Sequence, residues 1–149
     1  MLEITESAQP DPVAVAETLA ALKGLGVRLA IDDFGTGFAS ISRLLDSPFD
    51  VIKIDEGLLQ AMKTDERAGA IVSGVLDLGR RLGSTTIAEG VEDASQLTEL
   101  RQLGCDYGQG FHFSPALTAD DLEAAVRVET APAIWSRRSQ RERISRFLG

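Results

Sequence analysis

The stretch Gly26-Val-Arg-Leu-Ala-Ile-Asp-Asp-Phe-Gly-Thr-Gly37 places two adjacent aspartates at the end of a short apolar run. Glycine in the left-handed conformation commonly ends a helix, so Gly26 predicts a helix end followed by a β-strand over residues 27–32. Side chains alternate along a strand, but where the strand breaks into a loop both Asp32 and Asp33 can face one mouth. There each could hold one of two metal ions about 3.5–4 Å apart. The alternative is that one aspartate caps the next helix.

The same arrangement returns along the chain as a weak internal repeat. Gly83 and Gly104 each follow a helix-like run and precede a strand-like run. Polar residues follow the three glycines at nearly constant spacing: Asp32 six residues after Gly26, Glu89 six after Gly83, and Gln109 five after Gly104. This spacing predicts that polar groups recur at the same end of successive strands.

Four acid-rich segments stand at or just past the ends of short apolar runs. They are Leu2-Glu-Ile-Thr-Glu6, Asp32-Asp-Phe-Gly-Thr-Gly37, Ile52-Lys-Ile-Asp55 and Ile87-Ala-Glu-Gly-Val-Glu92. In a barrel of alternating strands and helices, the strand ends gather the reactive groups. Clustered carboxylates at such a place favour a divalent metal site.

Strand-like and helix-like runs alternate along the chain, which predicts an α/β fold with parallel strands. About five strands are expected, at residues 2–5, 27–32, 51–54, 85–88 and 107–111. A closed barrel of this type needs eight strands and typically about 250 residues. The 149 residues therefore predict a partial TIM-like (β/α) barrel of about five βα units, with the N-terminal part of the barrel missing.

Apolar stripes and capping residues predict four helices. Asp11-Pro12 opens the first, with Val15, Leu19 and Leu22 on one face, and Ile71, Val75, Leu78 and Leu82 form the stripe of the second. Asp93 and Gln96 open the third, with Leu97, Leu100 and Leu103, and Thr118 and Asp121 open the fourth, with Leu122, Ala125 and Val126.

The composition, with 44% hydrophobic residues, is that of one soluble globular domain. No apolar stretch reaches the roughly 20 residues that span a bilayer, and the start lacks a secretory leader, so we expect a cytoplasmic protein. The single cysteine, Cys105, can form neither an internal disulfide nor a thiolate zinc site.

The net charge of −8 is unevenly distributed. Residues 127–149 carry six arginines against two glutamates, a net charge of +4, and the rest of the chain has a net charge of −12. An acidic body repels DNA, although it can bind a phosphodiester when metal ions neutralise both partners. The expected organisation is a domain over residues 1–130 and a basic tail over 131–149. We interpret the tail as solvated or disordered; the alternative is a segment that contacts a partner or membrane through Trp135 and Phe147.

Lys53, between Ile52 and Ile54, is the most diagnostic single residue. Its burial in a strand would be costly unless the ammonium reached a polar mouth, where it could hold a water or neutralise phosphate. The alternative is a structural ion pair with Asp55 or Glu89.

Gly35 and Gly37 give the loop after Asp33 unusual backbone freedom, so the loop could close over a substrate. The alternative is an ordinary tight turn.

Taken together, these motifs resemble the C-terminal part of an EAL domain, the bacterial cyclic di-GMP phosphodiesterase. The matching segments span residues 2–115 in the family's order: Leu2-Glu-Ile-Thr-Glu-Ser7, Asp32-Asp-Phe-Gly-Thr-Gly37, Pro48-Phe-Asp-Val-Ile-Lys-Ile-Asp55, Ala88-Glu-Gly-Val-Glu92 and Tyr107-Gly-Gln-Gly-Phe111. The resemblance implies hydrolysis of cyclic di-GMP to linear pGpG with Mg²⁺ or Mn²⁺ in a two-metal site.

The resemblance also implies roles for individual residues. Glu3 and Asp32 would be metal ligands, Asp33 would reach the second metal, Lys53 would touch the nucleophilic water, and Glu89 would assist as a base or metal-linked carboxylate. Glu6 would pin the loop that contains Gly35 and Gly37, Glu92 would support the site, and Gln109 would line the same mouth.

Three elements of the family pattern are absent: the Glu-Ala-Leu segment, a substrate-gripping arginine near it, and a metal-binding asparagine. The substrate-binding residues are therefore unknown, and the chain as given is expected to be inactive or weakly active.

Two alternatives remain open within the family. The chain could be a non-catalytic cyclic di-GMP-binding or interaction module that completes its barrel with a second copy or with an N-terminal half, or a truncated product without independent function. A different metal-dependent barrel, such as an enolase-like lyase, also explains the carboxylates, but it explains the Asp32–Gly37 motif less well.

Overall fold

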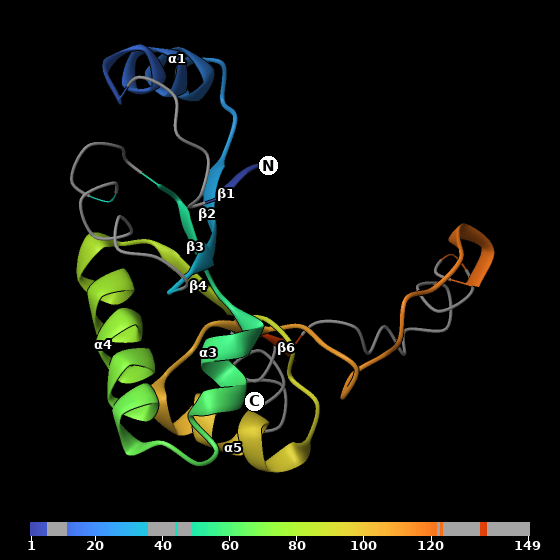
Figure 1. Ribbon diagram of the computed structural model, residues 1–149. Helices are drawn as coiled ribbons and strands as arrows, with labels where there is room; N and C mark the ends of the chain where they lie inside the picture. The colour runs from blue at the N-terminus through green and yellow to red at the C-terminus, as the bar shows by residue number, and fades with distance from the viewer. Residues whose placement is uncertain (6–11, 36–43, 45–48, 122, 124–134, 137–149) are drawn as a thin grey trace, which may run out of the picture.

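The computed structural model describes residues 1–5, 12–35, 44, 49–121, 123 and 135–136, and its centre is a single β-sheet (Figure 1). The strand order is β1-β2-β3-β4-β5-β6, with β1 to β5 parallel and β6 antiparallel to β5. The strands are β1 (Leu2–Thr5), β2 (Leu29–Phe34), β3 (Val51–Ile54), β4 (Thr85–Ala88), β5 (Tyr107–Gly108) and β6 (Trp135–Ser136). The predicted α/β fold with five parallel strands is confirmed.

Helices connect the parallel strands. They are α1 (Pro12–Gly24), α3 (Glu56–Ala61), α4 (Glu66–Leu82) and α5 (Ala94–Leu103). In Figure 1, α4 runs alongside the sheet, while α1 lies beyond the amino end of β2. Because β1 to β4 pair in parallel, their carboxyl ends meet at one end of the sheet.

The glycine repeat expected from the sequence is confirmed in the backbone. Gly26, Gly83 and Gly104 have φ values of 81°, 72° and 87°, so each takes the left-handed conformation at a helix end. The predicted opening of α5 is also confirmed, because Asp93 and Gln96 form a reciprocal capping box.

The predicted apolar face of α4 was partly wrong. Ile71 is 53% exposed and Leu82 is 50% exposed. The face that packs on the sheet instead consists of Ala68, Val72, Val75, Leu76 and Gly79. At Gly79 the helix approaches β4 so closely that a Cβ atom would lie 2.6 Å from Thr86 Cγ2. This close approach rotates the helix away from the stripe that periodicity alone favours.

Two strand boundaries differ from those expected. β2 covers residues 29–34 instead of 27–32, because the Leu29 N–H donates to Asp50 Oδ2 at 2.8 Å and pairing continues past the aspartates. β5 stops at Gly108 instead of residue 111, because the chain then turns and the Phe113 N–H donates to the Gly110 carbonyl at 3.0 Å.

The fourth predicted helix is described only at its start, where Thr118 Oγ1 accepts from the Asp121 N–H at 3.2 Å. Its predicted apolar residues, Leu122, Ala125 and Val126, lie outside the described residues. Of the predicted tail, only the two residues of β6 are described, so the domain boundary at residue 130 stays a prediction.

The core lies between the sheet and its helices. Its fully buried side chains include Leu29, Ile31, Ile52, Ile54, Leu59, Val72 and Leu100. Cys105 is also buried, and desolvation raises the pKa of its thiol to about 11. Among the described helices, none is both long and apolar enough to cross a bilayer.

Candidate metal and phosphodiester site

Lys53 is buried at the centre of the candidate site, with only 6% of its surface exposed. Its Nζ lies 2.7 Å from Asp32 Oδ1, 2.9 Å from Glu89 Oε1 and 3.1 Å from Glu3 Oε2. An ammonium has three N–H donors, so the three carboxylates together can engage all of them. The predicted convergence of these four side chains is observed.

Parallel pairing explains why residues so far apart in sequence meet here. Glu3 lies on β1, Asp32 on β2 and Lys53 on β3, while Glu89 directly follows β4. The Glu89 N–H donates to the Ile54 carbonyl at 3.1 Å, which places Glu89 next to the carboxyl end of β3. The four groups therefore come from neighbouring strands and meet at one end of the sheet.

Asp33 joins the same face through an irregularity in β2. Ile31 pairs with Ile52 and Phe34 pairs with Ile54, so β2 has one more residue than β3 between these pairs. Asp33 has a φ of 56°, a left-handed conformation that aspartate tolerates better than most residues. This β-bulge interrupts the alternation of side chains that a regular strand would impose.

The bulge brings three acidic groups together. One carboxylate oxygen each from Asp32, Asp33 and Glu89 can be chosen so that all three lie within 4.8 Å of one another. All three residues are partly buried, and every donor is an oxygen, which is the ligand type that Mg²⁺ and Mn²⁺ prefer. The residues present therefore fit a hard divalent cation.

The electrostatics of the cluster favour an added positive charge. Desolvation raises the pKa of Glu89, and the nearby charges of Asp32 and Glu3 raise it further, while Lys53 opposes the shift. Burial alone would lower the pKa of Lys53, but hydrogen bonds to Asp32, Glu89 and Glu3 outweigh it and raise the pKa above its ordinary value. Lys53 thus stays cationic, and one ammonium faces at least three carboxylates.

Gln109 extends the site on its β5 side. Its Nε2 donates to Glu89 Oε1 at 2.9 Å, the same oxygen that Lys53 contacts. Both contacts are made to Oε1, so neither Lys53 nor Gln109 occupies Glu89 Oε2. Gln109 therefore orients the Glu89 carboxylate and leaves its second oxygen for other chemistry.

Other predicted residues lie elsewhere or cannot be placed. Asp55 does not pair with Lys53: its Oδ1 accepts from the Gly57 and Leu58 N–H groups and caps α3, a helix that the sequence did not predict. Glu92 contacts Lys63 at 3.6 Å. Gly35 has a φ of 115°, as expected of the loop glycine. Glu6 and Gly37 lie outside the described residues, so their roles stay predictions.

Comparison with known proteins assigns the chain and its fold to one family. The family model of the EAL domain matches residues 1–116, which contain all the residues of the site. The chain belongs to the EAL domain family. The resemblance read from the sequence motifs is thereby confirmed.

Known EAL proteins are similar to this chain in sequence and in fold. Over 115 residues the chain is 42% identical to the cyclic di-GMP phosphodiesterase RocR of Pseudomonas aeruginosa, covering 76% of this chain and 29% of RocR. The EAL domain of Mycobacterium smegmatis DcpA superposes with a TM-score of 0.80 at 34% identity, over 85% of this chain and 57% of that one. Klebsiella pneumoniae BlrP1, a manganese and cyclic di-GMP complex, superposes with a TM-score of 0.71 at 36% identity, over 76% and 29%. The chain thus spans only part of each EAL relative.

The sequence reasoning missed one group of residues beside the EAL site. Lys63, in the turn after α3, contacts Asp93 and Glu92 at 3.1 and 3.6 Å. The sequence did contain a signal for α3, the helix that precedes Lys63. Asp55 stands directly before Glu56 and Gly57, a position that suits a helix N-cap.

Proposed function

We propose that this chain forms part of a two-metal phosphodiesterase site that hydrolyses cyclic di-GMP to linear pGpG. The observation that carries the proposal is the meeting of Glu3, Asp32 and Glu89 around the buried Lys53. The name of RocR and the cyclic di-GMP complex of BlrP1 support this choice of substrate.

We assign Glu3, Asp32 and Asp33 to hold Mg²⁺ or Mn²⁺. Asp32 and Asp33 share an oxygen cluster with Glu89, and Glu3 meets Asp32 at the Lys53 ammonium. Divalent ions bound there would supply an activated water at neutral pH and stabilise charge on the phosphodiester. The excess of carboxylates over ammonium groups, together with the all-oxygen donor set, supports this assignment.

Lys53 orients the attacking water in the proposed reaction. Its three N–H groups face three carboxylates. When metal and substrate are bound, one of these N–H groups must therefore donate to the water instead of to a carboxylate. Because the hydrogen bonds raise the pKa of Lys53, it acts as a cationic donor and not as a base.

Glu89 accepts the proton from that water. Lys53 and Gln109 both contact Oε1, so we assign the proton to Oε2. The raised pKa of Glu89 moves it towards the range in which a carboxylate accepts a proton efficiently. The water oxygen then bonds to phosphorus, the P–O3′ bond of one linkage breaks, and the leaving O3′ takes up a proton from solvent to give the 3′-hydroxyl of linear pGpG.

The test is hydrolysis of cyclic di-GMP with Mn²⁺, measured by chromatography of pGpG. Glu89→Ala should lower the rate by about 10²–10⁴-fold, because it removes the proton acceptor. Arg81→Met is the matched control, since Arg81 is largely exposed and pairs with Asp77 on α4. Equal rates for wild type and Glu89→Ala would reject the mechanism.

A second candidate is a non-catalytic module that binds cyclic di-GMP or completes its barrel with another copy or an N-terminal half. It is favoured by β1, which among the described strands pairs only with β2 and leaves Leu2 41% exposed. Calorimetry that detects cyclic di-GMP binding without turnover would select this module. If the chain shows neither binding nor turnover, it has no independent function. The cytoplasmic location and the lack of DNA binding stay predictions.

A further inference from the structure

The segment Gly90–Asp93 directly follows Glu89, a residue of the candidate site. Glu89 is held to β3 by its backbone N–H, and the chain then bends at Gly90, whose φ is 67°. Beyond this point the strand no longer fixes the backbone. The position of Glu89 therefore depends on what holds the next four residues.

On the β5 side, backbone hydrogen bonds hold this segment. The Val91 N–H donates to the Gln109 carbonyl at 3.0 Å, and the Val91 carbonyl accepts from the His112 N–H at 2.9 Å. Val91 itself is fully buried. Side-chain substitutions leave this anchor largely intact, because it is made by the backbone.

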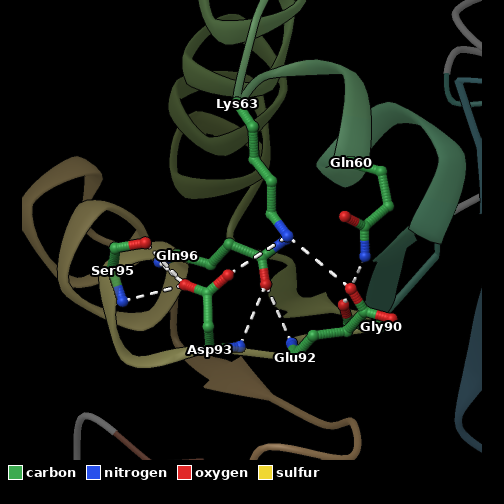
Figure 2. Close-up of polar contacts among 7 residues, drawn as sticks. All are labelled: Gln60, Lys63, Gly90, Glu92, Asp93, Ser95 and Gln96. Carbon is green, nitrogen blue, oxygen red and sulfur yellow. Dashed lines mark hydrogen bonds and ion pairs between the residues drawn. The ribbon is translucent and has the colours of Figure 1, made fainter.

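On the α3 side, side chains hold the segment (Figure 2). Lys63 Nζ lies 3.1 Å from Asp93 Oδ2 and 3.6 Å from Glu92 Oε2, and Gln60 Nε2 donates to the Gly90 carbonyl at 3.4 Å. The Glu56 side chain packs directly against Gly90, in the space that the Cβ atom of any larger residue at position 90 would need. The contacts run from α3 and the turn after it to the residues following Glu89.

Asp93, the acidic partner of Lys63, is held in place by hydrogen bonds that do not involve Lys63. Asp93 Oδ1 caps α5 by accepting from the Ser95 and Gln96 N–H groups, both at 2.9 Å, which leaves Oδ2 for Lys63. Gln96 Oε1 accepts from the Glu92 and Asp93 N–H groups at 2.8 and 3.3 Å. The hydrogen bonds of Ser95 and Gln96, together with Lys63, hold the pKa of Asp93 below its ordinary value, so the carboxylate is ionised.

We propose that Lys63, assisted by Gln60, is a positioning residue that clamps Gly90–Asp93 against α3 and thereby fixes the geometry between Glu89 and Lys53. α3 starts immediately after β3, the strand that carries Lys53. The clamp thus links the end of the lysine strand to the end of the glutamate strand. Lys63 acts through Gly90–Asp93 and touches no reacting atom, and the inference rests on the function proposed for the site.

The expected effect is modest, because the clamp is half-exposed. The side chains of Lys63, Glu92 and Asp93 are 33%, 47% and 45% exposed, and such ion pairs are individually weak. Loss of both contacts should weaken Mn²⁺ binding by about three- to tenfold. A larger loss would indicate general misfolding and not a shift of one carboxylate.

The experiment combines hydrogen exchange without metal with Mn²⁺ titration calorimetry on the full chain. Lys63→Met should speed amide exchange in residues 89–93 several-fold, without changing exchange in β3, and should weaken Mn²⁺ binding. Lys63→Arg keeps the charge and should restore both. Asp93→Asn should reproduce Lys63→Met, because asparagine retains an N-cap acceptor but loses the charge that Lys63 binds.

The outcomes separate this inference from the proposed function. Arg81→Met breaks an exposed pair on α4 and should leave exchange at 89–93 and Mn²⁺ affinity unchanged. If wild type binds no Mn²⁺, the proposed function fails by itself. If wild type binds Mn²⁺ and Lys63→Met binds it equally well, the clamp does not position Glu89. Faster exchange with unaltered Mn²⁺ affinity overturns the inference as well, since it shows a purely structural contact.

Discussion

Asp32 and Asp33 are consecutive in the chain, yet both present carboxylate oxygens to the same cluster as Glu89. A regular strand would turn one of the two away. The β-bulge between Ile31 and Phe34, with Asp33 at a φ of 56°, removes this constraint. The backbone conformation of one residue therefore lets both aspartates contribute oxygens to one carboxylate cluster.

Asp33→Asn tests the role of this second carboxylate. Asparagine also tolerates the left-handed conformation, so the fold should be retained while one oxygen ligand loses its charge. Calorimetry should show Mn²⁺ stoichiometry falling from two ions to one. Asp33→Val should instead destabilise the protein by about 1–3 kcal/mol in urea unfolding, because a β-branched residue is strained there. Two ions bound to Asp33→Asn would argue against the assignment.

Lys53→Met tests whether the ammonium is the internal counter-ion of the cluster. With chelator present, the free energy of unfolding should fall by about 3 kcal/mol, because three carboxylates, two of them largely buried, lose their partner. Mn²⁺ should then stabilise the variant more than the wild type, since the metal replaces the lost charge. Lys23→Met is the control: it breaks the half-exposed Lys23–Asp50 pair and should cost about 1 kcal/mol or less, with no Mn²⁺ dependence.

Glu89→Gln should stabilise the metal-free protein while abolishing hydrolysis. The pKa of Glu89 is raised in the folded state, so the folded protein holds this proton more tightly than the unfolded chain. The contribution of Glu89 to the free energy of unfolding is thus most favourable below the unfolded pKa of about 4.3, and it declines as the pH rises above that value. The melting temperature of Glu89→Gln should exceed that of wild type at pH 7, and the difference should vanish near pH 4. A lower melting temperature at pH 7 would contradict this.

Gly79→Ala tests the close approach of α4 to β4. The new Cβ would lie 2.6 Å from Thr86 Cγ2, and Thr86 is buried, so overpacking should lower the free energy of unfolding by about 1–3 kcal/mol. Gly74→Ala is the matched control on the same helix, because its Cβ would meet nothing within 4 Å. It should stabilise the protein by about 0.5–1 kcal/mol through helix propensity. Chemical denaturation measures both, and two changes of the same sign would refute the packing argument.

Asp50→Ala gives a prediction with a defined pH dependence. A hydrogen bond from the Leu29 N–H holds the pKa of Asp50 below its ordinary value, and Lys23 lowers it further. The stabilisation is therefore present above the unfolded pKa of about 3.9 and is lost as the pH falls through the lower folded pKa. At pH 7 the variant should lose about 1–3 kcal/mol, and the gap to wild type should narrow steadily below pH 4. A gap that stays constant down to pH 2 would contradict this origin.

Features that depend on a few neighbouring residues were predictable from the sequence. The helix ends at Gly26, Gly83 and Gly104 and the capping box of Asp93 and Gln96 were all confirmed. Each is a contact or conformation within one turn of chain, so the local sequence contains everything needed to specify it. The number and order of the parallel strands followed from the same local patterns.

Features that depend on packing were not predictable in the same way. The buried face of α4 was set by the fit of Gly79 against Thr86 and Ile52. The clamp by Lys63 requires a turn after α3 to lie beside residues that follow β4. In both cases the partners are far apart in sequence, so periodicity carries no information about them.

The amino-acid sequence by itself determined the family, the order of the strands, and which acidic residues stand at strand ends, because these depend on local pattern and motif. Only the tertiary structure decided that Lys53 faces three carboxylates at once, and that a bulge at Asp33 bends β2 so that both aspartates serve one cluster. The physical reason is that register and bulges between paired strands determine which side chains meet across the sheet.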